Sequence, residues 1–283
     1  MGFRKRFAAA MISLVVAALS WASAAPASSH NPTGEFAPFG ECPLSNPEID
    51  HCVFGVTEGG SLDLGAKTIP LSNPITFQGG YVETPEIDFH GAENGDTLSK
   101  TPQPVPGGLL GITAPTSWPG FVQNWWNNGI NQGFTGVNAT IELAASATAI
   151  TLSFENWVNE EGTALGLPVK VKLENTLLGS NCYIGSNVNP IQANLTTGTS
   201  GALAGAAGSI SFNSGFTLIT LTGFELVNGT FAAPGASGCG GIFSFYVDPL
   251  INSIFGLPAA SGNNSLTLKG VFEVASDAPV RAP

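Results

Sequence analysis

Alternation of apolar and polar side chains with a period of two residues dominates the second half of this chain. In residues 169–174, Val169, Val171 and Leu173 alternate with three charged residues. Successive side chains of an extended chain point to opposite faces, so this run predicts a strand with one buried face and one wet face. Related apolar patterns predict further strands at 141–143, 150–155, 216–226 and 266–274. In 216–226 both parities are partly apolar, which is typical of a central strand covered on two sides.

Turn-forming residues separate these runs, and less regular strands are expected earlier in the chain. Gly- and Asn-rich breaks lie at 179–181 and 213–215. The short strands of the first half are expected at 52–56, 61–64, 68–71 and 75–78. Five prolines in 100–119 predict a loop or extended connector, which we interpret as a crossing within one domain. The chain is therefore expected to form an all-β antiparallel sandwich, a single β-rich domain over residues 25–283.

Two short helices are expected to accompany the strands. The first covers 119–128, where Phe121, Val122, Trp125 and Trp126 fall on one helical face and Gly129 follows as a stop. The second covers Pro249 to Phe255. There Asp248 is suited to capping the start, Pro249 to the first turn and Gly256 to the end.

The N-terminus has the pattern of a secretory signal peptide. Arg4, Lys5 and Arg6 precede an apolar run from 7 to 19, and Ala22-Ser23-Ala24 forms a small-x-small cleavage site. The apolar run is shorter than the roughly twenty residues that a membrane-spanning helix needs, and no later stretch is long enough. We therefore predict cleavage after Ala24, export of the mature chain to an extracellular or cell-surface location, and no insertion of that chain into a membrane.

Charge excludes several classes of partner. Loss of the three basic residues of the signal peptide leaves six basic residues against twenty acidic ones, a net charge of −14. A surface of this sign repels phosphate backbones and anionic lipid headgroups, so neither nucleic acid binding nor peripheral membrane binding is expected.

Four cysteines in an exported chain favour two disulfides. Three pairings are possible. We prefer Cys42 with Cys52 and Cys182 with Cys239, because each link then stays within its own segment of the chain. Zinc is disfavoured because the gap between Cys42 and Cys52 is much wider than the usual spacing of zinc-binding cysteines.

An acidic stretch is the first candidate for chemistry. It contains Glu83, Glu86, Asp88, His90, Glu93 and Asp96. Carboxylates with a histidine can bind calcium or act as general acid and base, but the spacing matches no calcium loop, and Gly91 and Gly95 favour an exposed turn. We interpret the stretch as a solvated loop and assign no metal, cofactor or catalytic residue.

The aromatic, amide-rich segment from Trp118 to Phe134 is the second candidate. Trp118, Trp125, Trp126 and Asn128 combine flat apolar rings with an amide, the groups that a sugar-binding face would use. The interpretation that we favour is structural: a short helix whose tryptophan pair closes one end of the sandwich.

Several stretches together resemble a group of uncharacterised secreted proteins of actinobacteria. They are Cys42–Pro47 leading to Cys52, the runs 64–65 to 78–80, 97–102, 182–186 and 238–241, and Asp248–Asn252 running on to 256–258. The resemblance implies export and a shared architecture, and it brings no activity or catalytic residues.

We therefore expect an exported, non-enzymatic binding or structural protein of the cell envelope or extracellular space. Its partner would be an envelope polysaccharide or another surface protein. The first alternative is a secreted hydrolase of an extracellular polymer that uses Glu83, Glu86, Asp88 or His90. A membrane β-barrel is a weaker alternative, because the strands are few and irregular.

Overall fold

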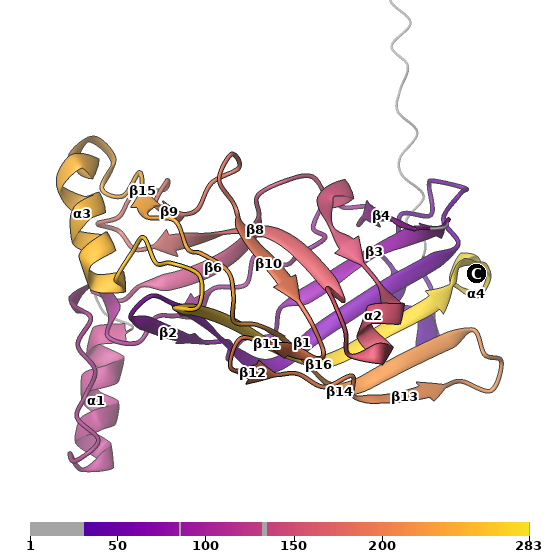
Figure 1. Ribbon diagram of the computed structural model, residues 1–283, viewed down its shortest axis with the longest axis horizontal. Coiled ribbons are helices and arrows are strands. Elements are labelled where there is room, and N and C mark those ends of the chain that lie inside the picture. Colours follow the sequence, from indigo (N-terminus) through magenta and orange to yellow (C-terminus); the bar gives the residue numbers. More distant parts are fainter. Residues whose placement is uncertain (1–30, 85, 132–134, 283) are drawn as a thin grey trace, which may run out of the picture.

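The computed structural model describes residues 31–84, 86–131 and 135–282. The predicted signal peptide, residues 1–24, lies outside the described residues. The described chain forms two antiparallel sheets that face each other, with the two longest helices at one end and shorter helices toward the other (Figure 1). The predicted all-β, disulfide-linked antiparallel fold is confirmed.

Sheet A contains the longest strands. Along its hydrogen-bonded order it comprises β13 (Ser209–Phe212), β14 (Leu218–Asn228), β16 (Asn264–Ser276), β1 (His51–Leu64), β3 (Thr76–Glu83) and β4 (Ile87–Gly91), with β2 (Lys67–Pro70) paired to β1. The two short strands expected at 52–56 and 61–64 are one strand, β1. A register shift between Thr57 and Gly59 interrupts the alternation and made the strand look divided in the sequence.

Sheet B is built around β8 (Leu165–Glu174). Its order is β15 (Ala236–Ser237), β9 (Tyr183–Ile184), β8, β6 (Asn138–Leu143) and β5 (Gln103–Pro104); β7 (Thr151–Leu152) and β10 (Ile191–Leu195) also pair with β8. A separate small ribbon joins β11 (Thr199–Ser200) and β12 (Leu203–Ala204). The proline-rich segment 100–119 contributes only β5 and a short 3-10 helix to regular structure.

The predicted alternation places the core between the sheets. Val169, Val171 and Leu173 of β8 are buried, whereas the charged residues between them are partly exposed. They pack in one apolar cluster with residues of sheet A such as Phe272 and Val274. A small apolar cavity of about 50 Å³ remains between the two sheets.

Helix α2 (Phe154–Asn159) replaces the end of the strand expected at 150–155. Ser153 caps this helix by accepting a hydrogen bond from the backbone N–H of Asn156 at 3.2 Å. Trp157 is fully buried; its ring meets that of Phe224 at 5.2 Å and its indole N–H donates to the Ala207 carbonyl at 3.2 Å. Residues from Phe154 onward form a helix because this conformation buries the large Trp157 ring against sheet A. The alternation of apolar and polar residues alone could not show this.

Both expected helices are present, as α1 (Gly120–Asn131) and α3 (Ser244–Phe255), but α1 continues through Gly129, so the expected stop there is wrong. Gly256 ends α3 in the left-handed conformation, as expected. The expected roles of Asp248 as the cap and of Pro249 in the first turn are wrong, because α3 begins at Ser244 and both residues lie inside it. The 3-10 helices are η1 (Gly34–Phe39), η2 (Gly108–Leu110), η3 (Ala147–Ala149) and η4 (Gly241–Phe243).

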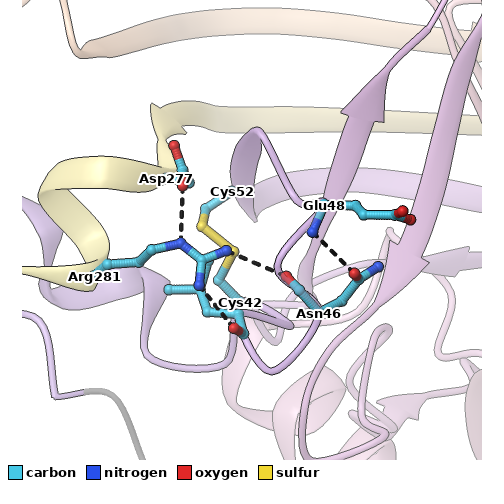
Figure 2. Close-up of polar contacts among 7 residues, drawn as sticks. Cys42, Asn46, Glu48, Cys52, Asp277 and Arg281 are labelled. Carbon is cyan, nitrogen blue, oxygen red and sulfur yellow. Dashed lines mark hydrogen bonds and ion pairs between the residues drawn. A yellow bond between two sulfur atoms is a disulfide. The ribbon is translucent and has the colours of Figure 1, made fainter.

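The pairing of the cysteines is as predicted. Disulfides join Cys42 to Cys52 and Cys182 to Cys239. The C-terminal helix α4 (Asp277–Arg281) lies over the first of these loops, where the Arg281 guanidinium donates to Asp277 and to the carbonyls of Leu44 and Asn46 (Figure 2). The end of the chain is thereby fastened to the beginning of the folded region.

Candidate functional site

The helical end of the sandwich is the part of the described surface with the most unusual chemistry. Helices α1 and α3 both lie at this end, and α1 projects away from the sheets (Figure 1). The turn between β1 and β2 supports α3, since the N–H of Ala66 donates to the Phe255 carbonyl at 2.7 Å. The Lys67 ammonium donates to the carbonyl of Gly111, just after η2, at 3.1 Å.

The inward face of α3 is partly polar. Ile251 and Phe255 are buried in the core. Beside them, the Asp248 carboxylate accepts hydrogen bonds from the backbone N–H groups of Gly238 at 3.1 Å and Cys239 at 2.7 Å. Asn252 binds Ala236 through two hydrogen bonds, of 2.6 and 3.1 Å. The polar side chains of α3 therefore hold it against the loop that the Cys182–Cys239 disulfide anchors.

The outward face of α3 is aromatic and aliphatic. Phe245, Tyr246 and Leu250 lie on it, and Ile242 and Phe243 of η4 continue it. Their exposed fractions range from 58% for Leu250 to 84% for Ile242. A surface helix ordinarily buries its apolar stripe and exposes its polar one. In α3 the core side is apolar at Ile251 and Phe255, with Asp248 and Asn252 beside them, yet a second apolar surface is left open to solvent.

Helix α1 adds a second apolar ridge. Phe121 is 76% exposed and Trp125, one turn later, is 74% exposed. Leu110 and Ile112, near η2, are exposed in the same region, where η2 contacts both α1 and α3. We call the exposed set of these elements the aromatic end: Leu110, Ile112, Phe121, Trp125, Ile242, Phe243, Phe245, Tyr246 and Leu250.

The segments that form the aromatic end carry almost no charge. The sequence has no charged residue between Lys100 and Glu142, and Asp248 is the single one between Glu225 and Lys269. Asp248 is bonded to two backbone N–H groups, and burial lowers the pKa of the Lys67 ammonium that meets Gly111. The acidic residues that give the protein its negative charge therefore lie almost entirely outside this end.

The structure separates the predicted sugar-binding residues. Trp118 and Trp126 pack edge to face, with ring centroids 5.6 Å apart, and both are half-buried. Trp125 and Asn128 are exposed. Gln123 fastens the preceding segment to α1 by donating to the Trp118 carbonyl at 2.6 Å. The three rings do not form one flat platform, and Trp125 is the ring that is free for contact.

The residues of the acidic stretch do not form one cluster but contact separate partners. Asp88 and His90 lie 3.5 Å apart on β4, which is a strand and not the expected loop. Glu93 accepts from Ser45, and Asp96 pairs with Lys100 at 3.7 Å. Within the described ranges no three His, Cys, Asp or Glu side chains are placed to hold a metal ion.

Glu83 and Glu86 border an open pocket of about 530 Å³ together with Glu155 and Tyr81. Burial is the main cause that raises the pKa of the Tyr81 hydroxyl, and the charges of Glu83 and Asp50 add to it. Tyr81 therefore stays neutral at physiological pH and supplies no charge to this pocket.

Sequence reasoning missed η4 and the exposed face of α3. Helical periodicity shows that two faces differ, but it does not show which face points inward. The long uncharged stretches around both helices were the available signal.

Comparisons with protein-family models, curated proteins and solved structures found no match to this chain. Among the described residues, no helix combines the length and apolar character needed to cross a membrane.

Proposed function

We propose that this chain is an exported, non-enzymatic binding protein of the cell envelope that attaches to an uncharged lipid surface through its aromatic end. Export is supported by the signal-peptide pattern at 1–24 and by the two disulfides, which form and persist in oxidising compartments. The observation that carries the proposal is the orientation of α3, which turns Phe245, Tyr246 and Leu250 outward while Asp248 and Asn252 face inward.

Lipid suits this surface for two reasons. Tryptophan, tyrosine and phenylalanine are enriched where proteins meet the boundary between headgroups and acyl chains, and helices that lie in this boundary insert an apolar face. The negative net charge of the mature chain repels anionic headgroups, but the surface of the aromatic end has no charged side chain. A zwitterionic or neutral headgroup layer is the complementary partner.

Flotation with vesicles of pure phosphatidylcholine tests the proposal directly. Complete burial of a Phe or Leu side chain contributes about 1.5–3 kcal/mol, and the partial burial expected at a lipid surface about 1 kcal/mol each. Replacing Phe245 and Leu250 together by Ser should therefore weaken vesicle binding by roughly thirtyfold. Tryptophan fluorescence should shift to the blue on binding, because Trp125 leaves water.

A matched control is available at the opposite end of the molecule, in the turn between β13 and β14 (Figure 1). Phe212 and Phe216 are exposed there, with ring centroids 5.9 Å apart. Replacing both by Ser should leave vesicle binding unchanged. Failure of the wild-type chain to float, or an equal loss in this control, would refute the proposal.

Other partners would give a different pattern. The sequence suggested an envelope polysaccharide or another surface protein as the partner. If the chain does not bind vesicles but binds isolated peptidoglycan, and Trp125→Ala abolishes the peptidoglycan binding, then α1 is a sugar-binding element instead. The hydrolase alternative is tested by substrate profiling, where turnover abolished by His90→Ala would favour an enzyme.

A further inference from the structure

A groove separate from the aromatic end has the chemistry of a site for a neutral sugar. It has a volume of about 750 Å³ and lies between β10 and the segments 228–234 and 258–261. Pockets for small ligands commonly measure about 300–1,000 Å³. None of its lining residues belongs to the aromatic end, so the inference goes beyond the proposed function and stands or falls independently of it.

One wall of the groove is formed by free amides. Gln192 and Asn194 are exposed, two residues apart on β10, while Ile191, Ala193 and Leu195 are buried between and beside them. Within the described residues, the side chains of Gln192 and Asn194 make no hydrogen bond. A primary amide offers both a donor and an acceptor, which matches a sugar hydroxyl that donates and accepts at once.

The opposite wall is apolar but exposes no aromatic ring to the groove. Exposed methyl groups of Ala232 and Ala260 and the exposed ring of Pro258 line it. Phe231 also borders the groove but is buried. Such a wall can pack against the C–H face of a sugar ring, whereas a flat aromatic ligand would lack a stacking partner.

The groove is held rigid by buried amides. Asn264 donates to the carbonyls of Phe231 and Ala260, both at 3.0 Å, and so joins the two segments of the apolar wall. Ala233 and Ala259 also exchange backbone hydrogen bonds of 2.9 Å. A preformed groove lowers the entropic cost of binding, which favours ligands whose individual contacts are weak.

Asn228 forms a fixed link between the amide wall and the apolar wall. Its side-chain oxygen accepts from the backbone N–H of Thr230 at 2.9 Å, and its NH₂ group donates to the Gln192 carbonyl at 3.4 Å. The same side chain therefore contacts β10 and the segment that follows β14.

The groove carries no charge. None of its lining residues is ionisable, although the chain has twenty acidic residues. A charged ligand would lose its hydration without gaining an ion pair. From the free amides, the apolar wall and the missing charge, we propose that this groove binds a neutral oligosaccharide.

Calorimetric titration of the mature chain with neutral hexasaccharides tests the inference. The probes are the β-1,4- and α-1,4-linked glucose hexamers and the β-1,4-linked mannose hexamer, with a galacturonic acid hexamer as the charged comparison. We expect at least one neutral probe to bind and the charged one not to bind. Gln192→Ala and Asn194→Ala should each weaken binding about fivefold, the loss of one neutral hydrogen bond.

Asn181→Ala is the matched control, because Asn181 is an exposed amide outside the groove. It should leave the affinity unchanged, and melting temperatures should show that all three variants fold. The inference is overturned if no neutral probe binds at millimolar concentration. It is also overturned if binding survives both groove variants and is lost with Trp125→Ala, which would place the sugar on α1.

Discussion

Asp248 should be the residue that keeps the apolar face of α3 turned outward. Its carboxylate accepts from two backbone N–H groups, those of Gly238 and Cys239, at 3.1 and 2.7 Å. Hydrogen bonds to a charged group contribute about 1.5–3 kcal/mol each, and Asp248 is partly exposed, so the lower part of that range applies. Asp248→Ala should therefore destabilise the contact between α3 and the 236–239 loop by about 2–3 kcal/mol. Asp248→Asn keeps one acceptor oxygen and should lose about half as much.

Amide hydrogen exchange followed by mass spectrometry resolves this effect locally. Protection of the 236–252 region should fall by roughly thirtyfold or more in Asp248→Ala, because about 2 kcal/mol corresponds to that factor in the opening equilibrium. Vesicle binding should weaken in parallel, since the apolar face is then no longer held in one orientation. Exchange in β4 and β13, at the end of the molecule opposite α3 (Figure 1), should not change.

Asp96→Ala is the matched control for removal of one carboxylate. Asp96 forms an exposed ion pair with Lys100 at 3.7 Å, and such pairs contribute at most about 1 kcal/mol. If Asp248→Ala leaves the protection of Gly238 and Cys239 unchanged, or if Asp96→Ala lowers it equally, the anchoring role of Asp248 is refuted.

Three further predictions concern the fold. Trp157→Ala should destabilise the chain by about 3–5 kcal/mol in urea unfolding, because it empties a fully buried site. Burial raises the pKa of Glu273 above the ordinary carboxyl value of 4.5, so the folded state binds this proton more tightly than the unfolded state. The free energy of unfolding should therefore fall as pH rises from 4.5 through the raised pKa of the folded state. Glu273→Gln should remove this part of the pH dependence, and unfolding midpoints from pH 4 to 7 would show whether it does. Arg281→Ala loses the bonds to the Leu44 and Asn46 carbonyls (Figure 2) and should destabilise by about 1–3 kcal/mol, which an unchanged melting temperature would contradict.

Strands with one wet face could be predicted because their pattern is local. In β8 each side chain points opposite to its neighbours, so the alternation of Val169, Val171 and Leu173 with charged residues was sufficient. The disulfide pairing was predicted from chain proximity, and both pairs are confirmed. Gly256 was recognisable as the end of α3 because a left-handed residue is a local requirement.

Features that depend on contacts between distant segments could not be predicted. The 150–155 run has the alternation of a strand, yet residues from Phe154 onward are helical because Trp157 must reach the core beside Phe224. The role of Asp248 was misread for the same reason, since its partners are in the 236–239 loop and not in its own helix.

The sequence by itself therefore determined strand alternation and two helices, because each depends on neighbours along the chain. It also indicated the two disulfides, because each pair of cysteines lies within its own segment of the chain. Tertiary structure alone decided which face of α3 meets water and which segments enclose the groove. The reason is physical: helical periodicity distinguishes two faces, but the bonds from Asn252 to Ala236 and the burial of Ile251 select the one that points inward. The groove forms only where β10, 228–234 and 258–261 come together in space, and no local sequence pattern predicts that these segments are neighbours.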